Sequence, residues 1–168
     1  GKYSAATQAA VVLALAVMFW DIVPHAYLVG LAASVSALCA AAFLATRRYG
    51  GVRAEVEYDS PARGAFLVLR LLAFGRGLAW GTMPAVMLPS LDDAYRVVVG
   101  AVCAALISHA YVAGPVFSLA LLAVTPVVLG MFVGLTGCEG PVGQYVAVLL
   151  SLYGTFVFVS ARRMCRHA

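Results

Sequence analysis

Charged residues are scarce in this sequence. Of its 168 residues, 11% are Asp, Glu, Lys or Arg and 64% are hydrophobic, and the mean hydropathy is +0.98. A soluble domain is about one quarter charged, and its interior is too small to hide so much apolar surface. The scarcity of charge therefore excludes an ordinary soluble domain. It predicts an all-α integral membrane protein whose main partner is the lipid bilayer.

Motifs of catalysis and metal binding are also missing. The sequence has no HExxH, no G-x-S-x-G, no P-loop and no paired acids within an apolar run. The four cysteines, Cys39, Cys103, Cys138 and Cys165, form no CxxC and no Cys/His metal spacing. We therefore expect no enzyme activity in this chain and no metal cofactor. The net charge of +4 does not predict nucleic-acid binding, because the basic residues gather in a few loops.

Long apolar runs fill most of the chain. Each has about the 20 residues that an α-helix needs to cross the hydrocarbon core. We expect a single domain, residues 1–168, of six transmembrane helices arranged as three hairpins. The helices are predicted at residues 5–20, 26–46, 64–88, 94–110, 115–135 and 144–161. The one long polar stretch, residues 47–63, links the second helix to the third.

Lysine and arginine lie almost entirely on one side of these runs. With a cytoplasmic N-terminus, the outer turns hold only Arg96. The inner segments hold Lys2, Arg47, Arg48, Arg53, Arg63, Arg162, Arg163 and Arg166. Cytoplasmic loops of membrane proteins carry an excess of Lys and Arg. Eight basic residues against one predict that both termini are cytoplasmic and that residues 47–63 form a cytoplasmic link.

Small residues recur at helical spacing in two of the runs. Ala73, Gly77 and Gly81 lie four residues apart in the third run, and Gly130 and Gly134 form a similar pair in the fifth. Such a face lets another helix backbone approach closely, so that van der Waals contact holds the two helices together. We expect helix packing at these positions, either within the bundle or between protomers.

A Trp-x-x-x-Pro pattern occurs twice and suggests a weak internal repeat. Trp20 and Pro24 end the first run, and Trp80 and Pro84 lie near the end of the third. The alternative is that tryptophan favours the outer interface and proline favours helix ends.

Arg76 is the most costly residue of the chain, because an arginine at the centre of an apolar span costs about 2.5–3.5 kcal/mol. One interpretation makes Arg76, with Trp80, Trp20 and His109, a binding site for an anionic or carbonyl-bearing ligand, or half of an ion pair. In the other, Arg76 extends to the cytoplasmic headgroups or bonds to backbone carbonyls, and His109 is a packed or interfacial residue. Haem ligation is not expected, because His25 and His109 are predicted at opposite membrane faces.

Acidic and histidine side chains gather in the predicted outer turns. They are Asp21, His25, Asp92, Asp93 and Glu139. Oxygen and nitrogen ligands of this kind suit hard or borderline cations. These five residues, here called the acidic mouth, can therefore concentrate cations from outside. The simpler interpretation is that turns need polar residues. We predict no metal site here.

A family resemblance rests on Trp20–Pro24, Arg47–Arg48 and Arg63–Pro84. The pattern is a hairpin with a tryptophan, an arginine-rich cytoplasmic link, and a third helix with Arg and Gly-x2-Trp-Gly. It resembles the six-helix sensor regions of MASE (membrane-associated sensor) type in bacterial signalling proteins, and it covers most of the chain. The resemblance implies a homodimeric input domain in the bacterial inner membrane. Such a domain relays an external or lipid-borne signal to a cytoplasmic diguanylate cyclase, phosphodiesterase or histidine kinase domain, which this sequence does not contain.

The alternative interpretation is a small dimeric transporter or channel-like protein, in which Arg76 and the acidic mouth mark the pathway of the solute. Two features count against it: the fourth and sixth runs carry no interior charge, and the sequence has no paired set of broken helices. A structural subunit of a membrane complex is a third possibility.

Overall fold

The regular structure is helical throughout the part of the chain that the computed structural model describes, which confirms the predicted all-α class. The described residues are 2–49, 60–113, 117–138, 145–146, 148–149, 152–156 and 159. The elements are α1 (Lys2–Met18), α2 (His25–Tyr49), α3 (Ser60–Met87), the 3-10 helix η1 (Leu88–Ser90), α4 (Asp93–Ala113) and α5 (Phe117–Thr136). The described residues between 145 and 159 are helical as well.

Several helices are long and apolar enough to cross a membrane. The described residues contain four such segments: His25–Arg48, Gly64–Ser90, Asp93–Ala110 and Ser118–Thr136. The apolar part of α1, Ala6–Met18, is shorter. The predicted sixth helix, residues 144–161, lies partly outside the described residues. Length and composition thus support a membrane protein.

The outer surface of the bundle is apolar, as lipid contact requires. Large aliphatic side chains stand exposed on separate helices, among them Val17 at 78%, Leu44 at 63% and Val97 at 71% exposed. In water such surfaces drive aggregation, whereas in a bilayer they meet hydrocarbon. The core holds tightly buried large side chains, including Phe19 and Met83, both 0% exposed.

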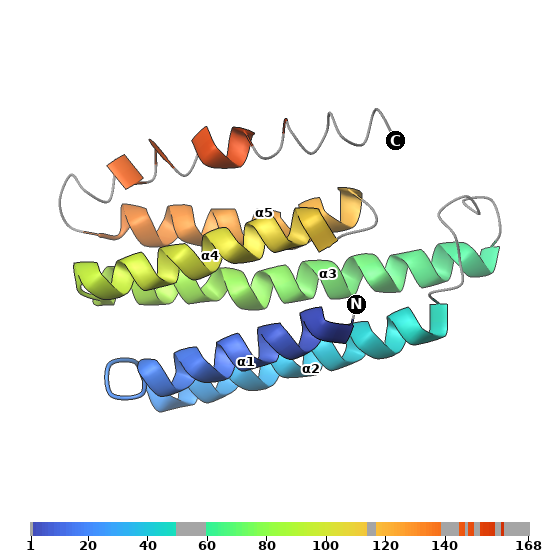
Figure 1. The fold of residues 1–168 in the computed structure, drawn as a ribbon, viewed down its shortest axis with the longest axis horizontal. Helices are drawn as coiled ribbons and strands as arrows, with labels where there is room; N and C mark the ends of the chain where they lie inside the picture. Colours follow the sequence, from blue (N-terminus) through green and yellow to red (C-terminus); the bar gives the residue numbers. More distant parts are fainter. Residues whose placement is uncertain are drawn as a thin grey trace.

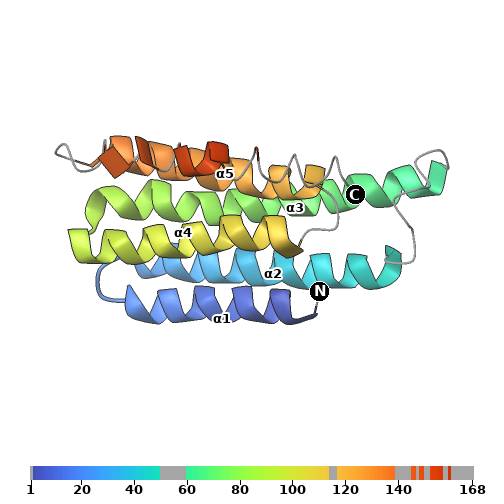
Figure 2. The same ribbon diagram turned by 45° about the horizontal axis from the view of Figure 1, so that its top comes forward.

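The helices run up and down along one common direction (Figure 1). Helices α1 and α2 form the expected hairpin, and α2 packs on α3. In both ribbon views α3 lies between the α1–α2 hairpin and α5 (Figure 2). The most extensive contact of α3 is with α5, although α4 follows it directly in sequence, and α4 packs mainly on α5. Hairpin pairing alone therefore does not describe this bundle.

Glycines explain why α3 and α5 lie so close. At four glycines of these two helices, an added Cβ atom would overlap the backbone of the opposite helix. The overlaps pair Gly77 with Ala123, Gly81 with Pro126, Gly130 with Gly81, and Gly134 with Pro84. The two helices thus touch backbone to backbone over about two turns, where dispersion contact is densest. The face of α3 that carries Gly77 and Gly81 is covered by α5 of the same chain.

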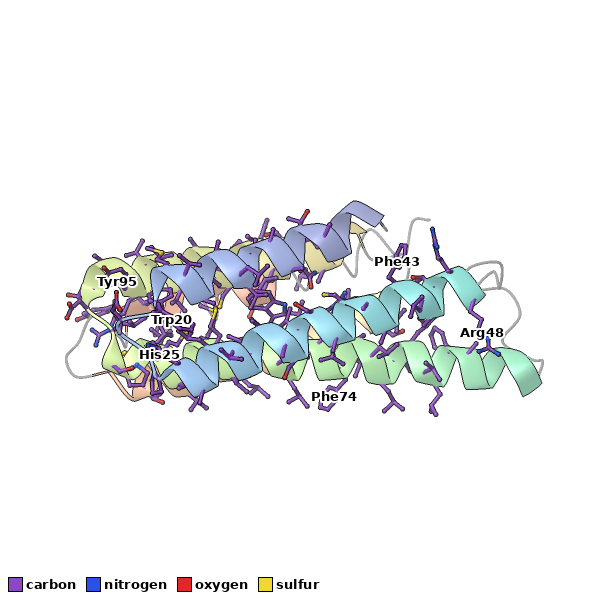
Figure 3. All side chains as sticks on the ribbon, turned by 90° about the horizontal axis from the view of Figure 1, so that it is seen from below. Trp20, His25, Phe43, Arg48, Phe74 and Tyr95 are labelled. Carbon is purple, nitrogen blue, oxygen red and sulfur yellow. The ribbon has the colours of Figure 1, made fainter. Side chains whose placement is uncertain are left out.

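The two ends of the bundle differ in charge. Trp20, His25 and Tyr95 lie at one end, and Phe43 and Arg48 lie at the other (Figure 3). The end with the α1–α2 turn also carries Asp21, while Arg47 and Arg48 close α2 at the opposite end. The uneven distribution of charged residues found in the sequence therefore corresponds to the two ends of the bundle's long axis.

Candidate functional site

A small cavity lies between four helices in the interior of the bundle. Its volume is about 30 Å³. It is lined by Gln8 of α1; Arg76, Gly77 and Trp80 of α3; Leu106, Ile107 and Ala110 of α4; and Ala123, Val124 and Val127 of α5. One water needs about 10–15 Å³ of such space, so the cavity has room for one or two groups of that size. Most of its wall is apolar, and its polar side chains come from α1 and α3.

Trp80 brings an unsatisfied donor to this site. Its side chain is 2% exposed, and its Nε1 is the buried side-chain nitrogen or oxygen that lacks a hydrogen-bond partner within the described residues. The indole N–H is a donor only. Leaving such a group buried and unpaired costs about 1–3 kcal/mol. The site therefore offers a hydrogen bond to any acceptor that reaches Nε1.

Arg76 brings a positive charge. It is half-buried and lies near the middle of Gly64–Ser90, the segment of α3 that can cross the membrane. Half of the hydrocarbon core measures about 15 Å, which is more than an arginine side chain spans. No ion pair or hydrogen bond links Arg76 to another residue in the described part of the chain. Its position favours a ligand over the headgroups as the partner of the guanidinium.

Gln8 is a buried amide that the sequence analysis missed. It is 7% exposed, and its Oε1 accepts a hydrogen bond from Cys39 Sγ at 3.5 Å. Cys39 lies within electrostatic range of the Arg76 guanidinium. The amide NH₂ of Gln8 retains two donors. The signal was present in the sequence, because a glutamine within an apolar run needs a partner, but the partner comes from a different helix.

Together these side chains form a donor-rich pocket. The Arg76 guanidinium, the Trp80 indole and the Gln8 amide all supply N–H groups, and the lining residues that the structure describes include no carboxylate. An oxygen or halide acceptor that bonds to Arg76 and Trp80 offsets the costs of an unpaired buried charge and an unpaired N–H. The arrangement is suited to binding, and none of its lining residues is a nucleophile or a general base.

Two of the residues grouped with Arg76 by sequence lie elsewhere. Trp20 is 44% exposed and stacks on His25, with ring centroids 4.3 Å apart and an interplanar angle of 13°. It belongs to the turn after α1, at one end of the bundle (Figure 3). Trp80, by contrast, lies inside α3, so the two Trp-x-x-x-Pro patterns have different environments. His109 is half-buried on α4 and does not line the cavity.

The residues of the predicted acidic mouth lie at the surface where the structure describes them. Asp21, His25, Asp92 and Asp93 are exposed, and Asp93 pairs with Arg96 at 2.8 Å. Nowhere in the described residues do three or more His, Cys, Asp or Glu side chains come together as metal ligands. Glu139 lies outside the described residues. Arg96 Nε also donates to the carbonyl of Leu88 at 3.0 Å, so its role is to fasten η1 to α4.

A second, larger hollow of about 370 Å³ lies between α2 and α3. It is lined by Ala26, Tyr27, Gly30, Leu31, Ser34, Ala79 and Thr82. The Tyr27 and Thr82 hydroxyls are 3.2 Å apart and hydrogen-bond to each other. No charged residue lines this hollow, so it offers less for specific recognition than the Arg76 pocket.

One polar contact connects the pocket region to the last helical segment. Ser108 Oγ and Tyr153 Oη are 2.9 Å apart. Ser108 follows Ile107, which lines the cavity. The residue that contacts Tyr153 is therefore the direct neighbour in sequence of a residue in the wall of the cavity.

Comparison of the chain with protein families, with curated proteins and with solved structures gave no significant match.

Proposed function

We propose that this chain is the membrane-embedded input domain of a bacterial signalling protein and that the Arg76 pocket receives its ligand. In this proposal six helices cross the inner membrane with both termini in the cytoplasm. The four long apolar segments supply four of the crossings. Helix α1 and the segment that includes the helical residues between 145 and 159 supply the other two. The acidic end of the bundle faces outward, in agreement with the positive-inside rule.

The observation that carries the proposal is the connection between pocket and last segment. The pocket takes side chains from α1, α3, α4 and α5, and α4 also holds Tyr153 through Ser108. A ligand that fits one arrangement of these helices better than another shifts the population between the two arrangements. The shift reaches residues 152–156 through α4. In the sensor regions that this chain resembles, the segment after the last helix leads to the output domain.

The close contact at the glycines indicates which helices can move. Helices α3 and α5 touch backbone to backbone, and such packing resists small displacements because neither helix has a side chain that can adjust. We infer that α3 and α5 act as one unit and that α1 and α4 shift against it. A homodimer then uses a different face, because α5 covers Gly77 and Gly81.

A small transporter is the second candidate, and the position of Arg76 near mid-membrane favours it. The cavity counts against it. Its volume is about 30 Å³, and of the described residues in its wall Arg76 is the one that carries a charge. A transport route needs polar groups along the membrane, whereas this site is a single small pocket.

The test compares Arg76→Gln with Arg70→Gln in the natural full-length protein. Arg70 is on the same helix, is exposed, and packs over the Phe66 ring at 4.3 Å. For an input domain, Arg76→Gln shifts the basal level of second messenger or phosphorylation, and Arg70→Gln leaves it unchanged. A loss of solute flux in liposomes with unchanged signalling output contradicts the proposal and supports the transporter. Equal effects of the two variants contradict both.

A further inference from the structure

We propose that the Arg76 pocket binds one small monovalent anion, a halide or a terminal carboxylate. The inference rests on the proposed function for its role as a signal, whereas the binding itself follows from the pocket. The observations that carry it are a cavity of about 30 Å³, an unpaired Trp80 Nε1 and a half-buried Arg76 in one wall.

The hydrogen-bonding inventory selects for an anion over a cation or a neutral donor. Arginine and tryptophan side chains carry donors and no acceptor. The Gln8 carbonyl oxygen is engaged by Cys39 Sγ. An ammonium group or a metal ion entering here meets a positive charge and N–H groups. An anion is attracted by the positive charge and accepts hydrogen bonds from the N–H groups. Hydrogen bonds from a charged donor are stronger than those between neutral groups.

The size of the cavity and the charge in its wall narrow the class of anion that fits. The cavity has room for one or two water-sized groups, which suits chloride or the carboxylate end of a small acid better than sulfate. Arg76 is the one charged residue among the described residues that line it, so a monovalent anion gives a neutral pair and a dianion leaves a net charge. Burial of an uncompensated charge is strongly unfavourable. The Ile107, Val124 and Val127 side chains contribute apolar surface to the wall and offer no hydrogen bonds to a hydrated ion.

The test uses the fluorescence of Trp80. The chain has two tryptophans, so a Trp20→Phe background leaves Trp80 as the single reporter. The whole chain is placed in phosphatidylcholine nanodiscs in a low-salt zwitterionic buffer and is titrated with sodium chloride, sodium formate or sodium sulfate, compared at equal ionic strength. We expect a saturable change in Trp80 emission with chloride, formate or both, and none with sulfate. A response to chloride alone identifies the ligand as a halide, and a response to formate assigns it to the carboxylate class.

Two variants in this background make the assignment specific. Arg76→Gln is expected to weaken the response by about tenfold or more, and the matched Arg70→Gln keeps it within about twofold. Circular dichroism checks that both variants are folded. The absence of any saturable response, an equal response to sulfate, or equal responses of the two variants overturns the proposal.

A second measurement covers the case in which Arg76→Gln does not fold. Trp80→Phe keeps an aromatic side chain and the Arg76 charge but removes the N–H. We expect chloride to raise the melting temperature of the unmodified chain and to raise that of Trp80→Phe less. Equal chloride-dependent shifts overturn the assignment of Trp80 to the site. Signalling output is not involved in either measurement, so failure of anion binding leaves the input-domain proposal standing, and the reverse also holds.

Discussion

Gly81 of α3 and Gly130 of α5 meet so closely that a Cβ atom on Gly130 would overlap the Gly81 carbonyl. Gly134 stands in the same relation to Pro84, one turn further along. In a bilayer no hydrophobic effect drives helices together, so close contact of this kind must supply the association energy. The α3–α5 pair is therefore the part of the bundle that tolerates substitution least.

A methyl group at Gly130 is expected to be destabilising. Gly130→Ala forces α3 and α5 apart, and overpacking of this kind costs about 1–3 kcal/mol. Gly100→Ala is the matched control, because Gly100 lies within α4 and a Cβ there meets nothing within 4 Å. The control is expected to gain up to about 1 kcal/mol from helix propensity. Unfolding in mixed micelles compares the two, and equal stabilities would contradict the backbone contact.

Gln8 is expected to matter for the ligand more than for stability. Gln8→Leu replaces a buried amide with an apolar side chain of similar size and leaves only the weak Cys39 thiol donor without its acceptor, so the cost to folding is expected to be small, at most about 1 kcal/mol. The chloride or formate response of Trp80 in the same variant is expected to weaken. Cys39→Ala is the control, because it removes the thiol and leaves the amide in place. A response that survives Gln8→Leu but not Cys39→Ala would show that the amide is not a ligand.

Orientation in the membrane is tested by labelling single cysteines. Asp92 lies at the acidic end and Thr46 at the basic end, and both are exposed. With Cys138 and Cys165 changed to serine, Cys39 and Cys103 remain buried. A membrane-impermeant maleimide is expected to label Asp92→Cys in intact cells, and Thr46→Cys only after permeabilisation. The reverse pattern would place the N-terminus outside.

The Ser108–Tyr153 hydrogen bond is expected to couple the two helical segments. Each of Ser108→Ala and Tyr153→Phe should cost about 0.5–1.5 kcal/mol, with little further loss in the double variant, because both break the same bond. Unfolding of the single and double variants measures the coupling. Strictly additive losses would mean that the two hydroxyls do not stabilise each other.

The sequence predicted the all-α class and the positions of the first five helices to within four residues, because apolar runs and their polar boundaries are local properties. It also singled out Gly77, Gly81, Gly130 and Gly134. It could not assign these glycines to one contact, because the partner of a small-residue face depends on tertiary packing. For the same reason Gln8 and Cys39 went unnoticed as neighbours of Arg76.

The two tryptophans illustrate the same limit. Their sequence contexts match, with proline four residues later in each case. Trp20, however, lies in a turn after α1 has ended at Met18, whereas α3 continues through Pro84 to Met87. Proline is tolerated within a membrane helix when neighbouring groups compensate for the missing N–H bond. The same local pattern thus accompanies a turn at Trp20 and a continuous helix at Trp80, where Pro84 lies against Gly134 of α5.

The central claim is that occupancy of the Arg76 pocket changes how the last segment lies against α4. Spin labels at Val97→Cys of α4 and Phe156→Cys test this most directly, since both positions are about 70% exposed. With Cys138 and Cys165 changed to serine, the distance distribution is recorded in nanodiscs in sodium sulfate and in sodium chloride of equal ionic strength. A shift with chloride that Arg76→Gln abolishes is expected. Superimposable distributions in the two salts, in protein whose Trp80 fluorescence shows chloride bound, would contradict it.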